Sequence, residues 1–186
     1  MSESVILSEK DISRTLTRLA HEVVERNHNS DTLLLIGIRT RGIPLAQRIA
    51  SLIGEIKNQK VPVASIDFTL YRDDLYVTDD ITVEPSDIPT QVMDKNVVLV
   101  DDVLFTGRSV RAAIDALIDW GRPRSVELAV LVDRGHREMP IKADFVGKNI
   151  PSSTQERVQV RLKEVDGRDE VVLIKEQTLA GKGTDK

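Results

Sequence analysis

Two adjacent carboxylates, Asp101 and Asp102, stand between an apolar run at residues 96–100 and the sequence Thr-Gly-Arg-Ser at residues 106–109. The apolar run is typical of a strand buried on both faces, and residues 106–109 open a predicted helix. Open α/β sheets bind ligands at strand ends, and helix N-termini bind phosphate. Carboxylates suit ribose hydroxyls or Mg²⁺. Together these residues predict a cradle for a ribose 5-phosphate.

Paired acids at a strand end also occur in two other classes of protein. A haloacid-dehalogenase-like phosphatase needs a second acid two residues after its nucleophile, where this chain has Val103. A phosphoaspartate receiver carries its acids after the first strand, whereas two predicted strands precede these. A purely structural alternative has the acids cap the next loop while Thr106 caps a helix. Consecutive acids at a buried strand end are costly unless they bind something, which favours a ligand site.

A second candidate loop runs from Gly37 to Gly42. Its Gly-x₄-Gly spacing is that of a phosphate loop, but no Lys and Ser or Thr follow, so it is not a Walker motif. The backbone N–H groups around Thr40 and the side chains of Arg39 and Arg41 could hold an anion. The alternative is an ordinary turn between a strand and a helix.

Strands and helices alternate along the chain and position these loops. Apolar runs predict strands at residues 32–38, 61–70, 96–100 and 125–132. Helical spacing predicts helices at residues 9–26, 43–53 and 110–118, the first of them capped by Ser8 and Asp11. The order predicts right-handed βαβ units and a mostly parallel sheet flanked by helices. Residues 158–162 and 171–174 predict a closing antiparallel pair around Asp166 and Gly167.

Length and composition bound the class of protein. A chain of 186 residues with 40% hydrophobic residues favours one domain, expected at 1–180 with a disordered tail at 181–186. The absence of cysteine excludes disulfides and thiolate sites. No apolar run reaches the roughly 18 residues of a membrane span, and no signal peptide is evident, so a cytoplasmic location is expected.

The acidic balance is concentrated in one segment. Residues 71–91 hold six acidic residues and one basic residue, Arg72, so more than the whole net charge of −4 lies there. The segment has no sustained periodicity and two prolines, which predicts a long flexible loop, a type that is usually functional. The rest of the chain is near neutral, so its pI of about 5.5 does not exclude nucleic acid.

These motifs make the chain similar to type I phosphoribosyltransferases, and within that family to the pyrimidine-operon regulators that are also uracil phosphoribosyltransferases. The resemblance runs through residues 16–22, 37–42, 67–75, 97–109 and 131–151 in order. It implies the phosphoribosyltransferase fold with a flexible hood loop at 71–91. It also implies transfer of phosphoribosyl from phosphoribosyl pyrophosphate (PRPP) to uracil, giving UMP and pyrophosphate, with Mg²⁺.

The resemblance also assigns site residues. It makes residues 37–42 the pyrophosphate loop. Asp101, Asp102, Arg41 and Arg72 are expected to be catalytic, Arg72 because it is the only cation of the expected hood loop and could reach the pyrophosphate. Mg²⁺ is expected near the two acids, indirectly or through PRPP. Contacts to PRPP or UMP are expected from Arg39, Thr40, Arg41, Gly42, Asp101, Asp102, Val103, Leu104, Phe105, Thr106, Gly107, Arg108 and Ser109. Base contacts are expected from Val132, Arg134, Phe145, Val146 and Lys148, which follow the next strand.

Two basic clusters could serve a second function. Arg14, Thr17, Arg18 and His21 form one stripe of the first helix. The other cluster contains Arg134, His136, Arg137 and Lys142. On their own these residues fit a solvated surface. The resemblance instead implies binding of the pyr operon leader mRNA, in response to UMP or UTP, and six aromatic residues exclude an aromatic RNA platform.

The resemblance extends to the partners of the chain. It implies a homodimer or homotetramer, and neither a membrane nor a DNA partner is expected. The alternative function is a purine-type phosphoribosyltransferase that does not bind RNA.

Overall fold

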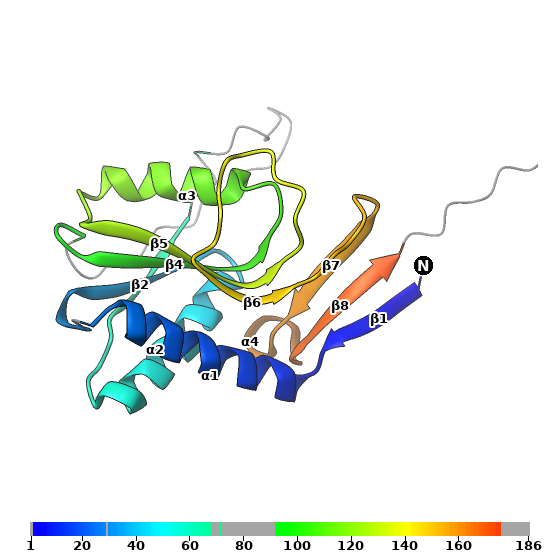
Figure 1. Cartoon of the computed structure of the whole chain (residues 1–186), viewed down its shortest axis with the longest axis horizontal. Helices are drawn as coiled ribbons and strands as arrows, with labels where there is room; N and C mark the ends of the chain where they lie inside the picture. Colours follow the sequence, from blue (N-terminus) through cyan, green and yellow to red (C-terminus); the bar gives the residue numbers. More distant parts are fainter. Residues whose placement is uncertain (1, 29, 68–70, 72–91, 176–186) are drawn as a thin grey trace, which may run out of the picture.

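A computed structural model describes residues 2–28, 30–67, 71 and 92–175 (Figure 1). Residues 72–91 of the expected hood loop, which include Arg72, and the tail at 181–186 lie outside the described residues. The strands are β1 (Ser2–Leu7), β2 (Leu33–Ile38), β3 (Val63–Ile66), β4 (Asn96–Leu104), β5 (Ser125–Asp133), β6 (Phe145–Asn149), β7 (Glu156–Arg161) and β8 (Glu170–Lys175). The helices are α1 (Glu9–Arg26), α2 (Gly42–Lys57), α3 (Arg108–Asp119) and α4 (Lys163–Asp166), with a 3-10 turn at Ser30–Thr32.

Five parallel strands form the central sheet in the order β3-β2-β4-β5-β6. After β2 the chain crosses through α2 to β3 at one edge, and it then returns to place β4 on the other side of β2. The strand order therefore reverses between β2 and β4. Ligand sites of open α/β sheets lie at such a reversal, outside the carboxyl ends of the two strands.

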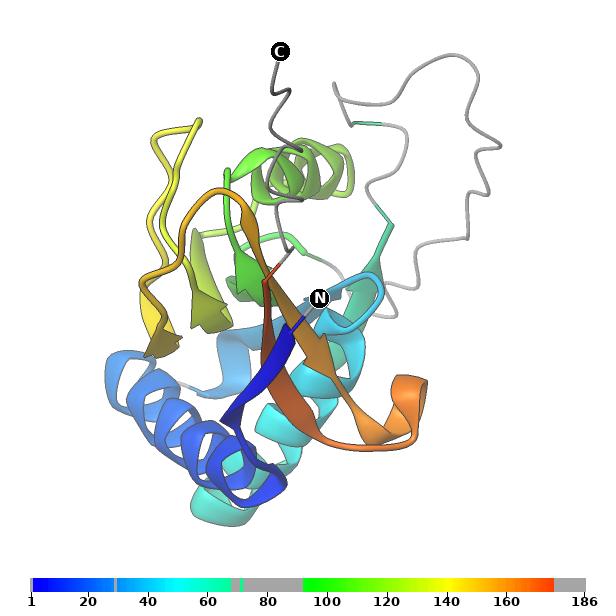
Figure 2. The same ribbon diagram turned by 90° about the vertical axis from the view of Figure 1, so that its right-hand side faces the viewer.

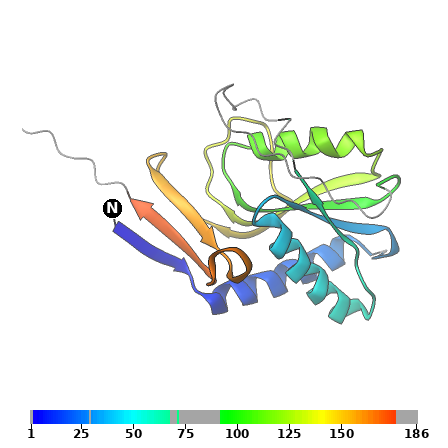
Figure 3. The same cartoon turned by 180° about the vertical axis from the view of Figure 1, so that it is seen from behind.

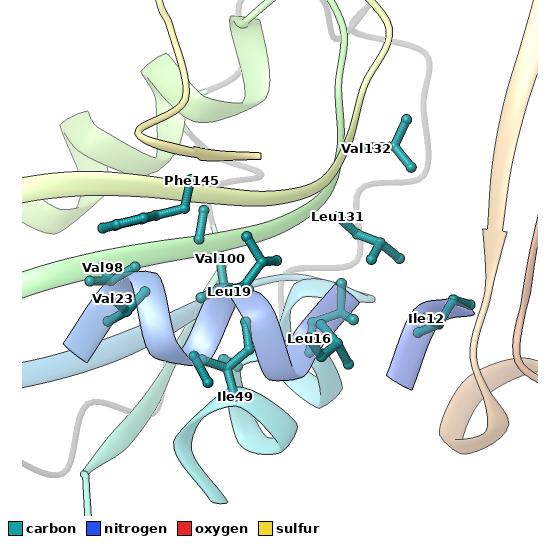
Figure 4. Packing of buried hydrophobic residues seen from close by; sticks show 14 of the residues in the cluster. Ile12, Leu16, Leu19, Val23, Ile49, Val98, Val100, Leu131, Val132 and Phe145 are labelled. Carbon is teal, nitrogen blue, oxygen red and sulfur yellow. The ribbon is translucent and has the colours of Figure 1, made fainter. Parts of the chain in front are cut away.

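The apolar residues of β2 alternate between the two faces of the sheet. Leu33 and Leu35 pack with α1 and α2, whereas Leu34 and Ile36 pack with α3. Figure 1 shows α1 and α2 on one side of the sheet and α3 on the other. Figure 4 shows the first layer, in which apolar side chains of α1 meet those of the central strands. Burial on both faces explains why β2 is an unbroken apolar run.

Helix α1 begins and ends where the sequence predicts. The Ser8 hydroxyl accepts a hydrogen bond from the Asp11 N–H at 3.3 Å, and the Asp11 carboxylate accepts one from the Ser8 N–H at 3.0 Å. This reciprocal pair satisfies N–H groups that the first turn leaves open. Within the described residues, every helix is too short or too polar to cross a membrane.

A separate antiparallel sheet, in the order β1-β8-β7, stands beside the central sheet (Figure 2). The predicted pairing of the two C-terminal strands is confirmed. Two details differ from the prediction. A turn of helix, α4, separates β7 from β8 in place of a tight hairpin, and β1 adds an N-terminal strand along β8.

The central sheet also differs in two places. Strand β4 continues to Leu104, so Asp101 and Asp102 lie within the strand, and Asp101 is aligned with Val130 of β5. Strand β6 joins the parallel sheet after β5 through residues 134–144, which contain no helix. Its sequence, Phe-Val-Gly-Lys-Asn, lacks the apolar run that identifies the inner strands.

Candidate functional site

The two loops singled out in the sequence meet where the strand order reverses. Residues 39–41 follow β2, and Asp101 and Asp102 lie near the end of the adjacent strand β4. The glycines of the first loop permit this approach. A Cβ at Gly42 would overlap the carbonyl oxygen of Val100, and one at Gly37 would overlap the backbone of Ile43. The Gly-x₄-Gly spacing therefore serves close backbone packing beside the acids.

A cavity of about 420 Å³ opens in front of β4 and the start of α3. It is lined by Asp101, Val103, Leu104, Phe105, Thr106, Gly107, Arg108, Ser109, Val110 and Glu138. Helix α3 begins after Gly107 without a side-chain cap. The Arg108 N–H donates to Thr106 Oγ1 at 3.3 Å. Because Gly107 has no side chain to accept from the next N–H groups of the first turn, this end of the helix suits a phosphate.

The two carboxylates of β4 are held in place by the backbone. The Asp102 N–H donates to Asp101 Oδ1 at 2.9 Å, and the Val103 N–H donates to Asp102 Oδ1 at 2.8 Å. Burial raises the pKa of Asp101 well above its usual range, and the charge of Asp102 raises it further. Burial also raises the pKa of Asp102, although the bond to Asp101 and the nearby Arg41 act in the opposite direction. Both groups thus disfavour negative charge until a cation or a hydrogen-bond donor arrives.

The first loop contributes a fixed cation. Arg41 directly precedes α2, and its guanidinium binds both carboxylate oxygens of Asp166, in α4. Hydrogen bonding to Asp166 raises the pKa of Arg41, and the charge of Asp102 raises it further. Arg39 is half-buried, Thr40 is exposed, and the peptide bond between them is cis. The close packing of Gly42 on Val100 places the expected pyrophosphate residues 39–42 beside the acids.

The expected base-contacting residues are divided between the core and the loops. The side chains of Val132 and Phe145 are buried in the core on the α1 side of the sheet (Figure 4). A base could reach only their backbone atoms. Val146 is half-buried, with its carbonyl oxygen accepting from Arg18, and Lys148 is exposed. The sequence pattern of a parallel edge strand does not distinguish these environments.

Arg134 has a structural environment that the sequence did not reveal. Only 7% of this residue is exposed. Its guanidinium lies 4.2 Å from the centre of the Phe105 ring and donates to Ser152 Oγ and to the carbonyl oxygens of Ser153 and Glu156. Because Phe105 lines the cavity, Arg134 connects the cavity wall to the loop before β7. Its contact with either a base or RNA stays a prediction.

The first basic cluster lies on an exposed stripe of α1. Arg14, Thr17, Arg18 and His21 are all exposed. Arg18 also donates to the carbonyl oxygens of Val146 and Gly147, so the stripe adjoins β6. Ser8 chiefly lowers the pKa of Asp11, and the charges of Arg14 and Lys148 lower it further, which places Lys148 near the same end of α1.

The second basic cluster is less uniform. His136 and Lys142 are exposed. His136 Nε2 nevertheless lies 2.5 Å from the carbonyl oxygen of Ser152. Arg137 is half-buried and donates to Asp133 Oδ2 and to the carbonyl oxygens of Phe105, Gly135 and Ile141. The structure therefore shows Arg137 bracing the loop after β5 against the cavity wall. A basic residue in a loop gives no sequence signal for such internal bonds.

Comparison with known proteins supports the resemblance. The phosphoribosyl transferase domain family matches residues 3–164. The chain is 55% identical over 175 residues to the bifunctional protein PyrR of Chloroflexus aurantiacus, covering 94% of this chain and 96% of that protein. It is 54% identical over 170 residues to the bifunctional protein PyrR of Clostridium beijerinckii, covering 91% and 96%.

Solved structures support the fold. A hypoxanthine phosphoribosyltransferase from Staphylococcus aureus is similar with a TM-score of 0.69 and 19% identity, over 94% of this chain and 93% of that one. The hypoxanthine phosphoribosyl transferase of Trypanosoma cruzi gives a TM-score of 0.72 and 17% identity, over 92% and 91%. At this identity the likeness concerns the fold alone.

Proposed function

The chain belongs to the phosphoribosyl transferase family, and from this premise we propose that it has two functions. It transfers phosphoribosyl from PRPP to uracil, giving UMP and pyrophosphate. It also regulates pyrimidine operon expression by binding RNA in response to UMP or UTP. The observation that carries the proposal is the identity of 54 to 55% with bifunctional PyrR proteins along more than nine-tenths of the chain.

A purine substrate is less well supported. The similar structures of hypoxanthine enzymes are only 17 to 19% identical to this chain. Such a likeness is shared by proteins with one fold and different substrates, so it does not select the base. The purine-type alternative therefore depends on fold alone, whereas the uracil assignment depends on sequence identity over nearly the whole chain.

The geometry accounts for the reaction without a protein nucleophile. The bond from the ribose anomeric carbon to the pyrophosphate oxygen breaks, a bond from that carbon to uracil N1 forms, and the N1 proton is released. Positive charge develops on the ribose, and negative charge on the leaving pyrophosphate. We assign the start of α3 to the 5-phosphate, Asp101 and Asp102 to the ribose hydroxyls, and the loop around Arg41 to pyrophosphate. Positioning and charge stabilisation then supply the catalysis.

Mg²⁺ fits this site as a companion of the substrate. Within the described residues, no three His, Asp or Glu side chains gather into a group that could hold a metal ion. Mg²⁺ commonly binds through one or two carboxylates together with waters and substrate phosphates, which suits Asp101 and Asp102. When bound, it would neutralise part of the pyrophosphate charge.

A substrate comparison tests the enzymatic half. The purified protein is supplied with PRPP and Mg²⁺ and with either uracil or hypoxanthine, and nucleotide formation is followed by chromatography. We expect UMP from uracil and no IMP from hypoxanthine. IMP formation at an equal or greater rate would favour the purine-type alternative.

For the RNA half, we propose that the exposed stripe of α1 (Arg14, Thr17, Arg18 and His21) contacts the leader RNA together with His136 and Lys142. The bonds of Arg134 and Arg137 within the protein give them a supporting contribution, in which they shape the loop after β5. Arginine and imidazole planes stack on unpaired bases, and their N–H groups hydrogen-bond to base edges. In a homodimer or homotetramer, two such stripes could face one RNA.

A gel-shift series tests this surface. His21→Ala should weaken binding to a pyr leader stem-loop about 10-fold or more, on the scale of one or two lost base contacts. His28→Ala provides a matched control, because His28 is an exposed histidine just beyond α1. UMP should tighten binding by the parent protein. Equal affinities of parent and His21→Ala across a salt series would refute the assignment.

A further inference from the structure

The turn between β7 and β8 is tied to α2 by two arginines. Residues 162–170, here named the acidic turn, include α4 and carry Asp166 and Asp169. Asp166 binds Arg41 at the start of α2, and Asp169 binds Arg48 nearly two turns later. Figure 3 shows α4 beside the beginning of α2. Both ion pairs join the acidic turn to α2. The Arg41 pair lies at the pyrophosphate loop, and the Arg48 pair lies farther along the helix.

The bond between Arg41 and Asp166 uses one side of the guanidinium. Nε donates to Oδ2 at 3.1 Å, and Nη2 donates to Oδ1 at 2.7 Å. An arginine has five N–H donors in a rigid plane, so three of them point away from this carboxylate. No acceptor within the described residues takes those three. Bidentate bonding thus fixes the plane of the side chain and leaves its outer fork available for an oxyanion.

Asp166 is itself held firmly enough to act as a guide. Its Oδ2 accepts a hydrogen bond from the Leu162 N–H at 2.9 Å. The Arg41 and Asp166 side chains are 28% and 20% exposed, so water surrounds the pair only in part. A side chain anchored at its own turn can limit the rotamers of its partner.

Arg41 lies close to the β4 acids, so the orientation that Asp166 imposes on it affects the ligand site. The next residue, Gly42, packs on Val100, directly before the two β4 acids. Arg41 therefore lies between two carboxylate groups, bonded to Asp166 and in the field of Asp102. Left unrestrained, a guanidinium could turn toward Asp102 and neutralise the group that the ribose requires. The bond to Asp166 opposes that collapse.

We propose that Asp166 is a positioning residue for pyrophosphate: it holds Arg41 so that the outer fork of the guanidinium meets the pyrophosphate oxygens. The inference rests on the proposed function, because it takes the loop at residues 39–42 as the pyrophosphate site. Asp166 does not touch the substrate. It orients the Arg41 side chain, so it affects the binding of PRPP and pyrophosphate and does not affect the binding of uracil.

Asp169 offers a matched control on the same turn. Its carboxylate accepts from Arg48 Nη1 and Nη2, both at 2.8 Å, and from the Lys163 N–H at 2.7 Å. Arg48 also binds Glu164. Asp169 therefore has the same chemistry as Asp166, with an arginine of α2 as its partner, but that arginine is remote from the pyrophosphate loop.

The test measures binding of magnesium pyrophosphate by calorimetry, which requires no turnover. Asp166→Asn should weaken binding about 10-fold, the scale of one misplaced charge-assisted contact. Asp166→Glu keeps the charge and should restore part of the loss, while Asp169→Asn should bind within twofold of the parent. In kinetics, Asp166→Asn should raise KM for PRPP and leave KM for uracil unchanged.

A double-mutant cycle separates positioning from general structural damage. In an Arg41→Gln background, Asp166→Asn should have no further effect on pyrophosphate binding, because the residue it orients is gone. The proposal is overturned if Asp166→Asn binds pyrophosphate as the parent does, if Asp169→Asn loses as much affinity, or if the Asp166 effect persists without Arg41. Failure of the parent to make UMP would count against the proposed function alone, because the binding comparison stands without turnover.

Discussion

Two pairs of aspartates in this molecule have opposite electrostatic environments. In the β4 pair, Asp101 is buried and Asp102 is half-buried, and loss of hydration raises the pKa of both carboxyl groups. In the acidic turn, the bond from Arg41 lowers the pKa of Asp166. Burial acts to raise the pKa of Asp169, yet its bonds to Arg48 and to the Lys163 N–H bring it below its usual value. The residue type is the same, and the partners decide the outcome.

The contrast separates a binding site from its scaffold. The carboxylates of the acidic turn have arginine partners within the protein, so their charge is already stabilised. The carboxylates of β4 receive hydrogen bonds mainly from their own backbone, and ionising them costs free energy in the folded state. Ligand hydroxyls or a cation would stabilise the negative charge of these two carboxylates, so the β4 pair is suited to bind them. The pair that weakens the ligand-free fold is thus the pair that we assign to catalysis.

The largest effect is expected at the β4 pair. Asp102→Asn should lower kcat/KM for UMP formation about 100-fold or more, the scale of a lost transition-state electrostatic contact. The Asn side chain retains the acceptor for the Val103 N–H, so the fold should survive. Steady-state kinetics with uracil and PRPP measures the change. An unaltered kcat/KM would remove the ribose assignment.

A smaller effect, on stability alone, is expected at Arg48. This side chain is 23% exposed and binds both Glu164 and Asp169. Arg48→Ala leaves two carboxylates without their partner and should lower the free energy of unfolding by about 1–3 kcal/mol. Urea denaturation measures the loss, and kcat should stay close to that of the parent. If Arg48→Ala lost activity and kept its stability, the ion pairs of Arg48 with the acidic turn would not be purely structural.

The smallest effect is a gain of stability at Asp101. The raised pKa means that the folded protein holds this proton more tightly than the unfolded chain does, whose reference value is 3.8. Stability is therefore lost as pH rises from that value through the raised pKa. Asp101→Asn removes the ionisable group and should raise Tm at pH 8 by about 2–4 °C, equivalent to about 1 kcal/mol at this size.

The gain at Asp101 should shrink as pH falls toward 4, where the parent carboxyl is protonated as well. Scanning calorimetry over this pH range measures it. A Tm difference that grows toward acid would reverse the proposed sign and would remove the contrast between the two pairs.

Local signals made much of the fold predictable from the sequence. The capping residues Ser8 and Asp11 identify the start of α1, and unbroken apolar runs identify the inner strands of the sheet. Strand β6 escaped prediction because an edge strand with one exposed side needs no apolar run. Strand β1 has an exposed surface for most of its length, and its pairing with β8 is set by residues at the far end of the chain.

The site was predictable where its residues are contiguous. The acids of β4 and the residues that begin α3 form one segment, and the structure brings the loop at 39–42 beside them. The partnership of Arg41 with Asp166 joins residues 125 positions apart, which no local pattern encodes. Likewise, the internal bonds of Arg134 and Arg137 depend on loop carbonyl oxygens that become acceptors only in the folded chain.

Binding of UMP by calorimetry tests the contrast between the two acid pairs most directly. UMP carries the ribose 5-phosphate that we assign to Asp101, Asp102 and the start of α3. We predict that Asp169→Asn binds UMP within twofold of the parent and that Asp102→Asn binds it at least about 10-fold more weakly, through loss of charge-assisted bonds to the ribose. Unchanged UMP affinity in Asp102→Asn, or an equal loss in Asp169→Asn, would contradict the assignment of the β4 pair as the ligand site.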